Sequence, residues 1–216
     1  MLCMRDVNSI RDRLLMARVI PVLRFDSVEK AQSVIDCLLE AGFSTVEIAL
    51  TTPGAMQLIA ELRSRVASSF LIGAGTVLNT RQAQQCLDAG ADYLVSPCTT
   101  LGITGLAHEA GCAALLGAFT PSEVHAATEQ GSDIVKLFPA SSGGPSHLAA
   151  LRAVFPDVMF CPTGGIDAGN MATYFKAGAA VVGVGNSIID QKALSLNDGA
   201  GMVAHAKRYL GLAAVP

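Results

Sequence analysis

The sequence predicts an α/β fold, a (β/α)8 TIM barrel with an extra N-terminal helix. Eight short apolar segments alternate with helix-like segments along the 216 residues, and eight parallel strands are the number that closes such a barrel. The chain is 51% hydrophobic and 15% charged, which is typical of strands covered on both faces. Its length suits one barrel domain, residues 1–216, and we expect no linker or second domain.

The predicted strands are short and mostly apolar. An open doubly wound sheet is the alternative fold, but the chain lacks a G-x-G-x-x-G sequence after an early strand. The predicted strands are Val19–Arg24, Thr45–Leu50, Phe70–Gly75, Tyr93–Ser96, Ala113–Gly117, Asp133–Leu137, Val158–Cys161 and Ala180–Gly183.

The predicted helices carry residues that favour helix ends. Ser27, Thr80 and Asp167 are expected to be N-caps, and Pro53 and Pro121 suit a first turn. Glycine closes a helix at little steric cost, and Ala-Gly pairs end four helices, at glycines 42, 90, 111 and 178. The helical segments between strands include Ser27–Glu40, Pro53–Arg65, Thr80–Ala89, Pro121–Gln130 and Pro145–Phe155.

Both ends of the chain are predicted to be helical. Met1–Met16 is expected to form the extra helix, which could plug the bottom of the barrel. Gly199–Leu210 is expected to be the eighth helix of the barrel.

Charge and composition exclude several classes of partner. The net charge is −3 without a basic run, so we expect no nucleic-acid partner. No apolar run is long enough to span a bilayer, and the first residues are too charged for a secretory signal, so we expect no membrane association. The six cysteines show no paired spacing, which indicates reduced thiols in a cytoplasmic protein. No cluster of His, Cys, Asp or Glu has metal-ligand spacing, so we expect no metal, and the four histidines are assigned no chemistry.

Lys136 is the residue that most strongly suggests chemistry. It lies in a predicted strand, whereas the other four lysines lie in helix-like segments. Loss of hydration disfavours the charged form of a buried lysine, and the neutral amine is the nucleophile that forms a Schiff base with a ketone. A lysine that reaches solvent from a strand end, or pairs with a carboxylate, is the alternative.

Strand alternation predicts that Glu47 points into the barrel interior, as Lys136 does. In the second predicted strand Val46 and Ile48 belong to the helix-facing set, so Glu47 points inward, and the same alternation points Ile134 and Lys136 inward. A buried unpaired charge costs several kcal/mol, so the two are expected together. A structural ion pair is the alternative to a catalytic one, but polar groups at the carboxyl ends of barrel strands are usually catalytic.

Two glycine-rich loops follow the seventh and eighth predicted strands. Barrels commonly bind phosphate at these loops, through backbone N–H groups that glycine leaves accessible. The alternative for the two loops is that they are ordinary turns. Cys161 lies beside the first loop, and a role as a small buried apolar residue is favoured over a role as a nucleophile. The predicted phosphate-binding residues are Gly164, Gly165, Gly185, Asn186 and Ser187.

Two further residues are candidates near the barrel mouth. Thr76, after the third strand, offers a hydroxyl next to exposed backbone N–H groups. Arg24, at the end of the first strand, could clamp a carboxylate through its planar guanidinium, although a surface arginine is equally consistent.

Four motifs in this order and spacing resemble the class I 2-keto-3-deoxy-6-phosphogluconate aldolase family: Glu47–Thr52, Gly73–Leu78, Val135–Ala140 and Pro162–Ile166. The resemblance covers nearly the whole chain, from Val19 to about Ser187. It implies a metal-independent barrel aldolase without a cofactor, usually a homotrimer. Such an enzyme cleaves a phosphorylated 2-keto-3-deoxy sugar acid into pyruvate and glyceraldehyde 3-phosphate.

The resemblance assigns roles by position. Lys136 matches the Schiff-base lysine, and Glu47 matches the general acid and base. Thr76 and Thr163 match residues near the pyruvyl end of the substrate. The phosphate binders match Gly164, Gly165 and Ser187.

Thr51 departs from the phosphogluconate pattern. Those enzymes carry an arginine at this position, whereas the phosphogalactonate branch has a small polar residue there and an arginine matching Arg24. The stretch Pro139–Pro145 also resembles that branch. The sequence is therefore more similar to the 2-keto-3-deoxy-6-phosphogalactonate aldolases, and phosphogalactonate, phosphogluconate or both are the expected substrates. Thr51 is included among the predicted substrate-binding residues and is expected to share the inward face of the second strand with Glu47.

Two rival functions are consistent with parts of the pattern. A metal-free sugar-phosphate isomerase would use a Glu, Asp or His pair as bases and would need no lysine inside the barrel. A non-catalytic sensor could bind a sugar phosphate in the same pocket. Neither rival would form a covalent adduct with pyruvate, so trapping with borohydride distinguishes the aldolase from both.

Overall fold

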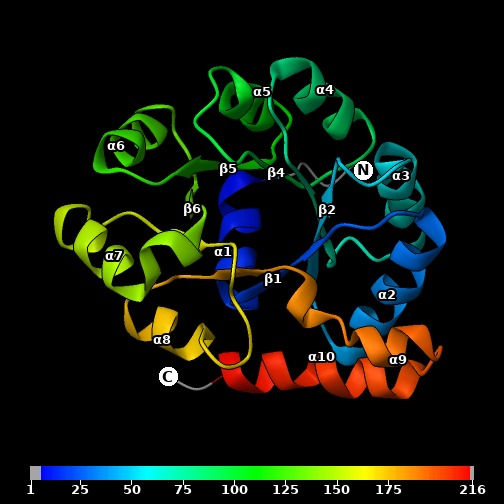
Figure 1. The fold of residues 1–216 in the computed structure, drawn as a ribbon. Coiled ribbons are helices and arrows are strands. Elements are labelled where there is room, and N and C mark those ends of the chain that lie inside the picture. Colours follow the sequence, from blue (N-terminus) through cyan, green and yellow to red (C-terminus); the bar gives the residue numbers. More distant parts are fainter. Residues whose placement is uncertain (1–5, 215–216) are drawn as a thin grey trace.

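The computed structural model describes residues 6–214 and confirms the predicted barrel of parallel strands ringed by helices (Figure 1). The strands hydrogen-bond in the order β7-β6-β5-β4-β3-β2-β1-β8, and a parallel bridge between Thr163 and Gly183 joins the two ends of that order. Their bounds are β1 Val19–Leu23, β2 Thr45–Ala49, β3 Leu71–Gly75, β4 Tyr93–Val95, β5 Ala113–Ala118, β6 Ile134–Leu137, β7 Phe160–Pro162 and β8 Val182–Val184.

Helices alternate with the strands as predicted. The turn η1 (Asn186–Ile188) and the short helix α9 follow β8 and precede the last helix. The bounds of the helices are α1 Val7–Ala17, α2 Val28–Ala41, α3 Ala55–Arg65, α4 Thr80–Asp88, α5 Ile103–Glu109, α6 Pro121–Glu129, α7 Ala140–Val154, α8 Met171–Lys176, α9 Gln191–Ser195 and α10 Gly199–Ala213.

Some of the predicted helix starts are wrong by a few residues. Asn79, not Thr80, caps α4, because its side chain accepts the N–H of Gln82. The predicted cap Asp167 instead accepts N–H groups inside a turn, and α8 begins after Asn170. The helix predicted from Pro53 begins at residue 55, after a glycine with positive φ.

Other predicted ends are confirmed. Ser27 caps α2, and Pro121 opens α6 behind a capping box formed by Thr120 and Glu123. The four glycines of the Ala-Gly pairs all have positive φ. Helix α7 begins earlier than predicted, and a non-helical Gly144 separates its first turn from the predicted segment that starts at Pro145.

Helix α1 plugs the barrel, as predicted (Figure 1). It spans residues 7–17, and residues 1–5 of the predicted segment lie outside the described residues. Its buried Ile10 and Leu14 pack in one cluster with inward-facing side chains that include Leu71 and Ala113, the first residues of β3 and β5. The amino-terminal end of the barrel is therefore filled, and the opposite end is left for a site.

The alternation predicted for the strands is confirmed. Val46, Ile48, Val135 and Leu137 belong to the cluster between the strands and the surrounding helices, while Ile134 lies in the inner cluster with α1. Glu47 on β2 and Lys136 on β6 lie between these outward-facing residues and consequently face the interior.

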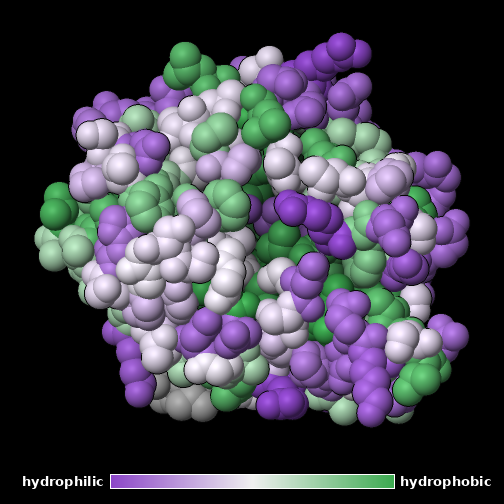
Figure 2. All heavy atoms as spheres, in the orientation of Figure 1, coloured by the Kyte–Doolittle hydropathy of each residue, from purple (hydrophilic) through white to green (hydrophobic). Residues whose placement is uncertain are grey.

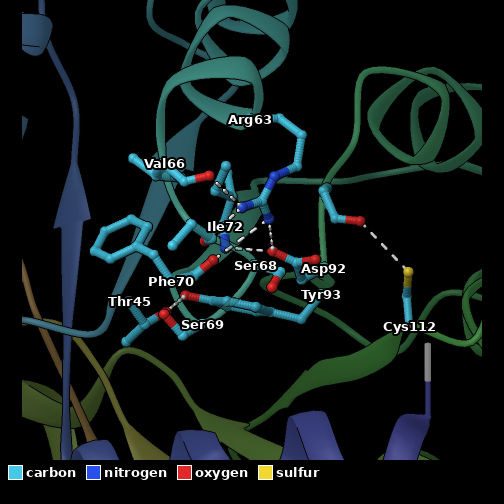
Figure 3. A network of polar contacts seen from close by, with 12 residues as sticks. Thr45, Arg63, Val66, Ser68, Ser69, Phe70, Ile72, Asp92, Tyr93 and Cys112 are labelled. Carbon is cyan, nitrogen blue, oxygen red and sulfur yellow. Dashed lines mark hydrogen bonds and ion pairs between the residues drawn. The ribbon is translucent and has the colours of Figure 1, made fainter. Parts of the chain in front are cut away.

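A polar network fixes the amino-terminal ends of β3 and β4 (Figure 3). The guanidinium of Arg63, on α3, lies 2.9 Å from the Asp92 carboxylate and donates to the carbonyl of Ala67. Asp92 also accepts the N–H of Ile72 at 2.8 Å. Because Asp92 directly precedes β4, the network sets where Tyr93 enters the barrel.

The surface mixes hydrophilic and hydrophobic residues around a depression at the middle of the ring in the view of Figure 2. Among the described helices, none is both long and apolar enough to cross a bilayer.

Candidate active site

Glu47 and Lys136 face each other inside the barrel. Glu47 Oε1 lies 3.6 Å from Lys136 Nζ, and the two residues are only 3% and 6% exposed. The separation is that of an ion pair rather than a short hydrogen bond. The aromatic ring of Phe138 lies over the amine, with its centroid 5.5 Å from Nζ. The geometry provides an amine and a proton carrier close enough to act on the same carbonyl group.

Two glycines of β3 make room for the inward side chains. A Cβ on Gly75 would overlap with the Glu47 carboxylate, and a Cβ on Gly73 would overlap with the Tyr93 ring. The register pairs Glu47 with Gly73 and Ala49 with Gly75, so these glycines lie beside the carboxylate on the neighbouring strand. Glycine is required at these two positions of β3 because the side chains of Glu47 and Tyr93 fill the space beside them.

We expect Gly75→Ala to displace the Glu47 carboxylate and to lower kcat roughly 10- to 100-fold, a part of the loss expected from removing the general base. Gly105→Ala is the matched control, because a Cβ on Gly105 in α5 would meet no atom within 4 Å. Steady-state kinetics of both variants would test this. Unchanged kcat in folded Gly75→Ala would show that the carboxylate can move without consequence.

A buried polar pair below Glu47 was not foreseen from the sequence. The hydroxyls of Thr45 and Tyr93 lie 2.9 Å apart (Figure 3), and both side chains are fully buried. Thr45 lies two residues before Glu47 in β2, so the two side chains share the inward face of that strand. Burial, and to a smaller extent the charge of Glu47, raises the pKa of Tyr93 well above its usual value. A neutral hydroxyl pair therefore forms the floor beneath the carboxylate. The signals in the sequence were the alternation along the second strand, which places Thr45 inward, and Gly73, whose missing side chain makes room for the Tyr93 ring.

Cys161 pairs in register with Lys136 but is poorly suited to be a nucleophile. Its side chain is buried, and burial raises the pKa of its thiol to about 12. The thiolate is the reactive form of cysteine, so at neutral pH this residue acts as a small filler, which agrees with the interpretation favoured from the sequence.

Alkylation should distinguish the cysteines. We expect iodoacetamide at pH 8 to label exposed Cys98 in the native protein and to leave Cys161 unlabelled, because its thiol is both buried and protonated. Peptide mass spectrometry would read out each site. Labelling of Cys161 at the rate of Cys98 would contradict the assignment.

The two candidate threonines lie at the carboxyl ends of β3 and β7. Thr76 follows Gly75 with φ of 65°, a left-handed conformation that a β-branched residue rarely adopts. Such strain is typical of functional sites. Thr163 is 6% exposed, and its hydroxyl donates to the Cys161 carbonyl at 3.3 Å. Their substrate-binding roles stay predictions.

Arg24 and Thr51 lie in neighbouring loops. Arg24 follows β1 directly and is exposed, and it has no ion pair or hydrogen bond with the part of the chain that the structure describes. The two loops are joined because the N–H of Phe25 donates to the hydroxyl of Thr52 at 3.1 Å.

The prediction that Thr51 shares the inward face of the second strand with Glu47 is wrong. Strand β2 ends at Ala49, where its pairing with β3 also ends, and Thr51 is exposed in the following turn. It borders a surface hollow of about 380 Å³ near the starts of α3 and α4.

The two glycine-rich loops meet at the ends of β7 and β8. Gly164 and Gly165 have φ of 96° and 77°, and the hydroxyl of Ser187 donates to the Ile166 carbonyl at 2.7 Å, which links the loops. A Cβ on Gly185 would meet no atom within 4 Å, so packing does not require glycine there. Asn186 and Ser187 begin the turn η1, whose first N–H groups have no partner within the turn.

Ser141 was not predicted but lies against these loops. Its N–H donates to the Gly164 carbonyl at 3.0 Å, and its Cβ is so close to Gly165 that a larger residue there would not fit. Its position after the lysine strand, in Pro139–Pro145, was the only indication in the sequence.

Among the described residues, no group of three or more His, Cys, Asp or Glu side chains lies close enough to hold a metal ion. The titratable groups that do meet at the barrel mouth are the amine and the carboxylate. This pair suits covalent chemistry on a carbonyl with proton transfer.

Comparisons with known proteins lead to one family of enzymes. The family model described as "Aldolase: KDPG and KHG aldolase" matches residues 10–204. A probable 2-dehydro-3-deoxy-6-phosphogalactonate aldolase of Rhizobium meliloti is 37% identical over 79% of this chain and 81% of its own length. A 2-dehydro-3-deoxy-phosphogluconate aldolase of Zymomonas mobilis is 33% identical over 80% of this chain and 81% of its own length. The solved KDPG aldolase of Legionella pneumophila, with pyruvate captured as a covalent carbinolamine, is 30% identical, covers 91% of this chain and 96% of its own, and has a TM-score of 0.83.

Proposed function

Because this chain belongs to the KDPG and KHG aldolase family, we propose that it cleaves a 2-keto-3-deoxy-6-phospho sugar acid to pyruvate and glyceraldehyde 3-phosphate. The chain is a class I aldolase, a carbon–carbon lyase that works through a Schiff base. The observation that carries the proposal is the buried Lys136–Glu47 pair at the open end of the barrel. Equal release of pyruvate and glyceraldehyde 3-phosphate from the phosphorylated substrate tests it, and failure to cleave any such acid would refute it.

Lys136 is proposed to act as the nucleophile. Its ammonium group gives a proton to Glu47, and the neutral amine then attacks the C2 ketone. The carbinolamine takes that proton back on its hydroxyl and loses water to give a protonated imine. The imine accepts the electron pair of the C3–C4 bond as that bond breaks. The resulting enamine is protonated at C3, and hydrolysis of the imine then releases pyruvate and the free amine.

Glu47 is proposed to move the protons of this sequence. Its Oε1 lies 3.6 Å from the amine, so in its protonated form it can give a proton to the carbinolamine hydroxyl, which then leaves as water. On cleavage it takes the proton of the C4 hydroxyl, directly or through water, so that the leaving fragment departs as an aldehyde.

The remaining polar groups are proposed to bind the two ends of the substrate. Arg24 and Thr76 would hold the carboxylate, and Thr163 the pyruvyl end. The two glycine-rich loops would bind the remote phosphate through Gly164, Gly165, Gly185, Asn186 and Ser187. Binding energy from the phosphate would orient the reacting carbon atoms.

The phosphogalactonate epimer is the proposed preferred substrate. The support is an arginine at position 24 together with a small polar residue at position 51. The exposed position of Thr51 favours an indirect role, in which it leaves space that an arginine would occupy. The resemblance to the family also supports a homotrimer, and the reduced cysteines support a cytoplasmic location.

We expect Arg24→Ala to raise the KM for the phosphorylated substrate about 10- to 100-fold, while kcat changes less. The substitution removes the guanidinium that is proposed to donate charged hydrogen bonds to the substrate carboxylate. Arg65→Ala is the control, since Arg65 is an exposed arginine paired with Asp36 at the end of α3. Initial rates on both epimers would be measured. Strong preference for the gluconate epimer, together with an unchanged KM in Arg24→Ala, would show that the carboxylate site is assigned wrongly.

A further inference from the structure

Two side chains of the last helix converge on one backbone atom of the β8 loop. The hydroxyl of Tyr209 donates to the Ser187 carbonyl at 2.6 Å, and Nε2 of His205 lies 2.9 Å from the same oxygen. A carbonyl only accepts hydrogen bonds, so Nε2 of His205 carries the donated proton. Both residues belong to α10, in the part of the chain for which the sequence predicted a helix without any chemistry.

The Tyr209 half of this double contact is buried, and the His205 half is partly buried. Tyr209 is 2% exposed, and its ring lies beside that of His205, with the centroids 5.6 Å apart. Hydrogen bonds in such a place orient the groups they join, because an unpaired buried polar group costs free energy. The carbonyl of Ser187 is thereby fixed relative to α10.

The contact extends to the second glycine-rich loop. Ser187 accepts from α10 through its carbonyl and donates from its hydroxyl to Ile166, which follows Gly165. One residue therefore joins α10, the β8 loop and the β7 loop. Gly185, two residues earlier, has open space on its side-chain face. The contacts with the carbonyl of Ser187 therefore restrain this segment from the side of α10.

We propose that Tyr209 and His205 are positioning residues for the phosphate of the substrate. They hold the backbone of Asn186 and Ser187 in the orientation in which its N–H groups face the anion, and they contact neither substrate nor reacting atoms. This inference rests on the proposed phosphate-binding role of the two loops. It predicts that α10 controls affinity for the phosphorylated fragment and leaves the covalent chemistry at Lys136 unaffected.

The test measures aldol addition of pyruvate to glyceraldehyde 3-phosphate and to unphosphorylated glyceraldehyde. We expect Tyr209→Phe and His205→Leu each to raise the KM for the phosphorylated aldehyde about 3- to 10-fold, and the double variant more. The KM for glyceraldehyde and the borohydride trapping of pyruvate should change little. His205→Gln keeps a donor and should restore most of the affinity lost in His205→Leu.

Ser132→Ala is the control for loss of a hydroxyl that donates to a backbone carbonyl. The hydroxyl of Ser132 donates to the carbonyl of Ile134 at 2.8 Å, at the amino-terminal end of β6 and away from both loops. This variant should leave the ratio of the two aldehyde KM values unchanged. A general loosening of the fold would instead raise both KM values and impair pyruvate trapping, which would overturn the proposal.

The outcomes separate this inference from the function on which it rests. If the wild type does not distinguish the two aldehydes, the phosphate site itself is assigned wrongly. If the wild type prefers the phosphorylated aldehyde but Tyr209→Phe, His205→Leu and the double variant keep that preference, only the role of α10 is refuted. His205→Leu tests the proposal alone should Tyr209→Phe fail to fold.

Discussion

Lys136→Arg is expected to lose cleavage activity by on the order of 10⁴-fold or more, the scale seen when a covalent nucleophile is removed. A guanidinium stays protonated and cannot form an imine, but it can still pair with Glu47. The variant should therefore fold, because the buried carboxylate keeps a cationic partner. Far-UV circular dichroism and thermal unfolding would establish this before activity is measured.

The matched control for this variant is Lys192→Arg. Lys192 is exposed on α9, away from the barrel interior, and the same substitution there should leave kcat and KM unchanged. Substantial cleavage by folded Lys136→Arg would mean that another group attacks the ketone.

Glu47→Gln is expected to slow cleavage roughly 10²- to 10⁴-fold, the contribution of a positioned general acid and base. Glutamine keeps the size of the side chain and its hydrogen bonding, so the loss reports proton transfer rather than packing. The amine remains, and pyruvate should still be trapped on Lys136, although more slowly. Single-turnover cleavage and timed borohydride trapping would separate the two steps.

Glu61→Gln is the control for the carboxylate. Glu61, on α3, accepts hydrogen bonds from Gln32 and Gln57 outside the barrel interior, so its substitution should leave the rate unchanged. Equal rates for Glu47→Gln and the wild type would assign the pair a structural role, the alternative that the sequence also allowed.

The barrel and its buried pair, Glu47 and Lys136, could be predicted because they depend on local rules. Alternation along a strand needs only a few residues, and it placed Glu47 and Lys136 inward without knowledge of the neighbouring strands. Glycine after alanine likewise predicted four helix ends. A lysine and a glutamate in apolar strands indicate a buried pair, because burying either charge without a partner costs free energy.

Other features depend on contacts between distant residues and could not be predicted. Thr51 was placed on the inward face because nothing in the local sequence marks the end of β2 at Ala49, which is decided by pairing with β3. The Thr45–Tyr93 contact joins two strands, and neither residue type suggests chemistry alone. The roles of Tyr209 and His205 could not be predicted for the same reason, since their partner is the backbone carbonyl of Ser187 in the loop after β8.

Borohydride reduction in the presence of pyruvate tests the central claim most directly. The protein should gain one three-carbon adduct, and peptide mass spectrometry should locate it on Lys136, the lysine that lies 3.6 Å from Glu47 inside the barrel. The Lys136→Arg variant should gain none. An adduct on Lys176 or Lys192, or no adduct on the active wild type, would contradict the assignment of Lys136 as the Schiff-base residue.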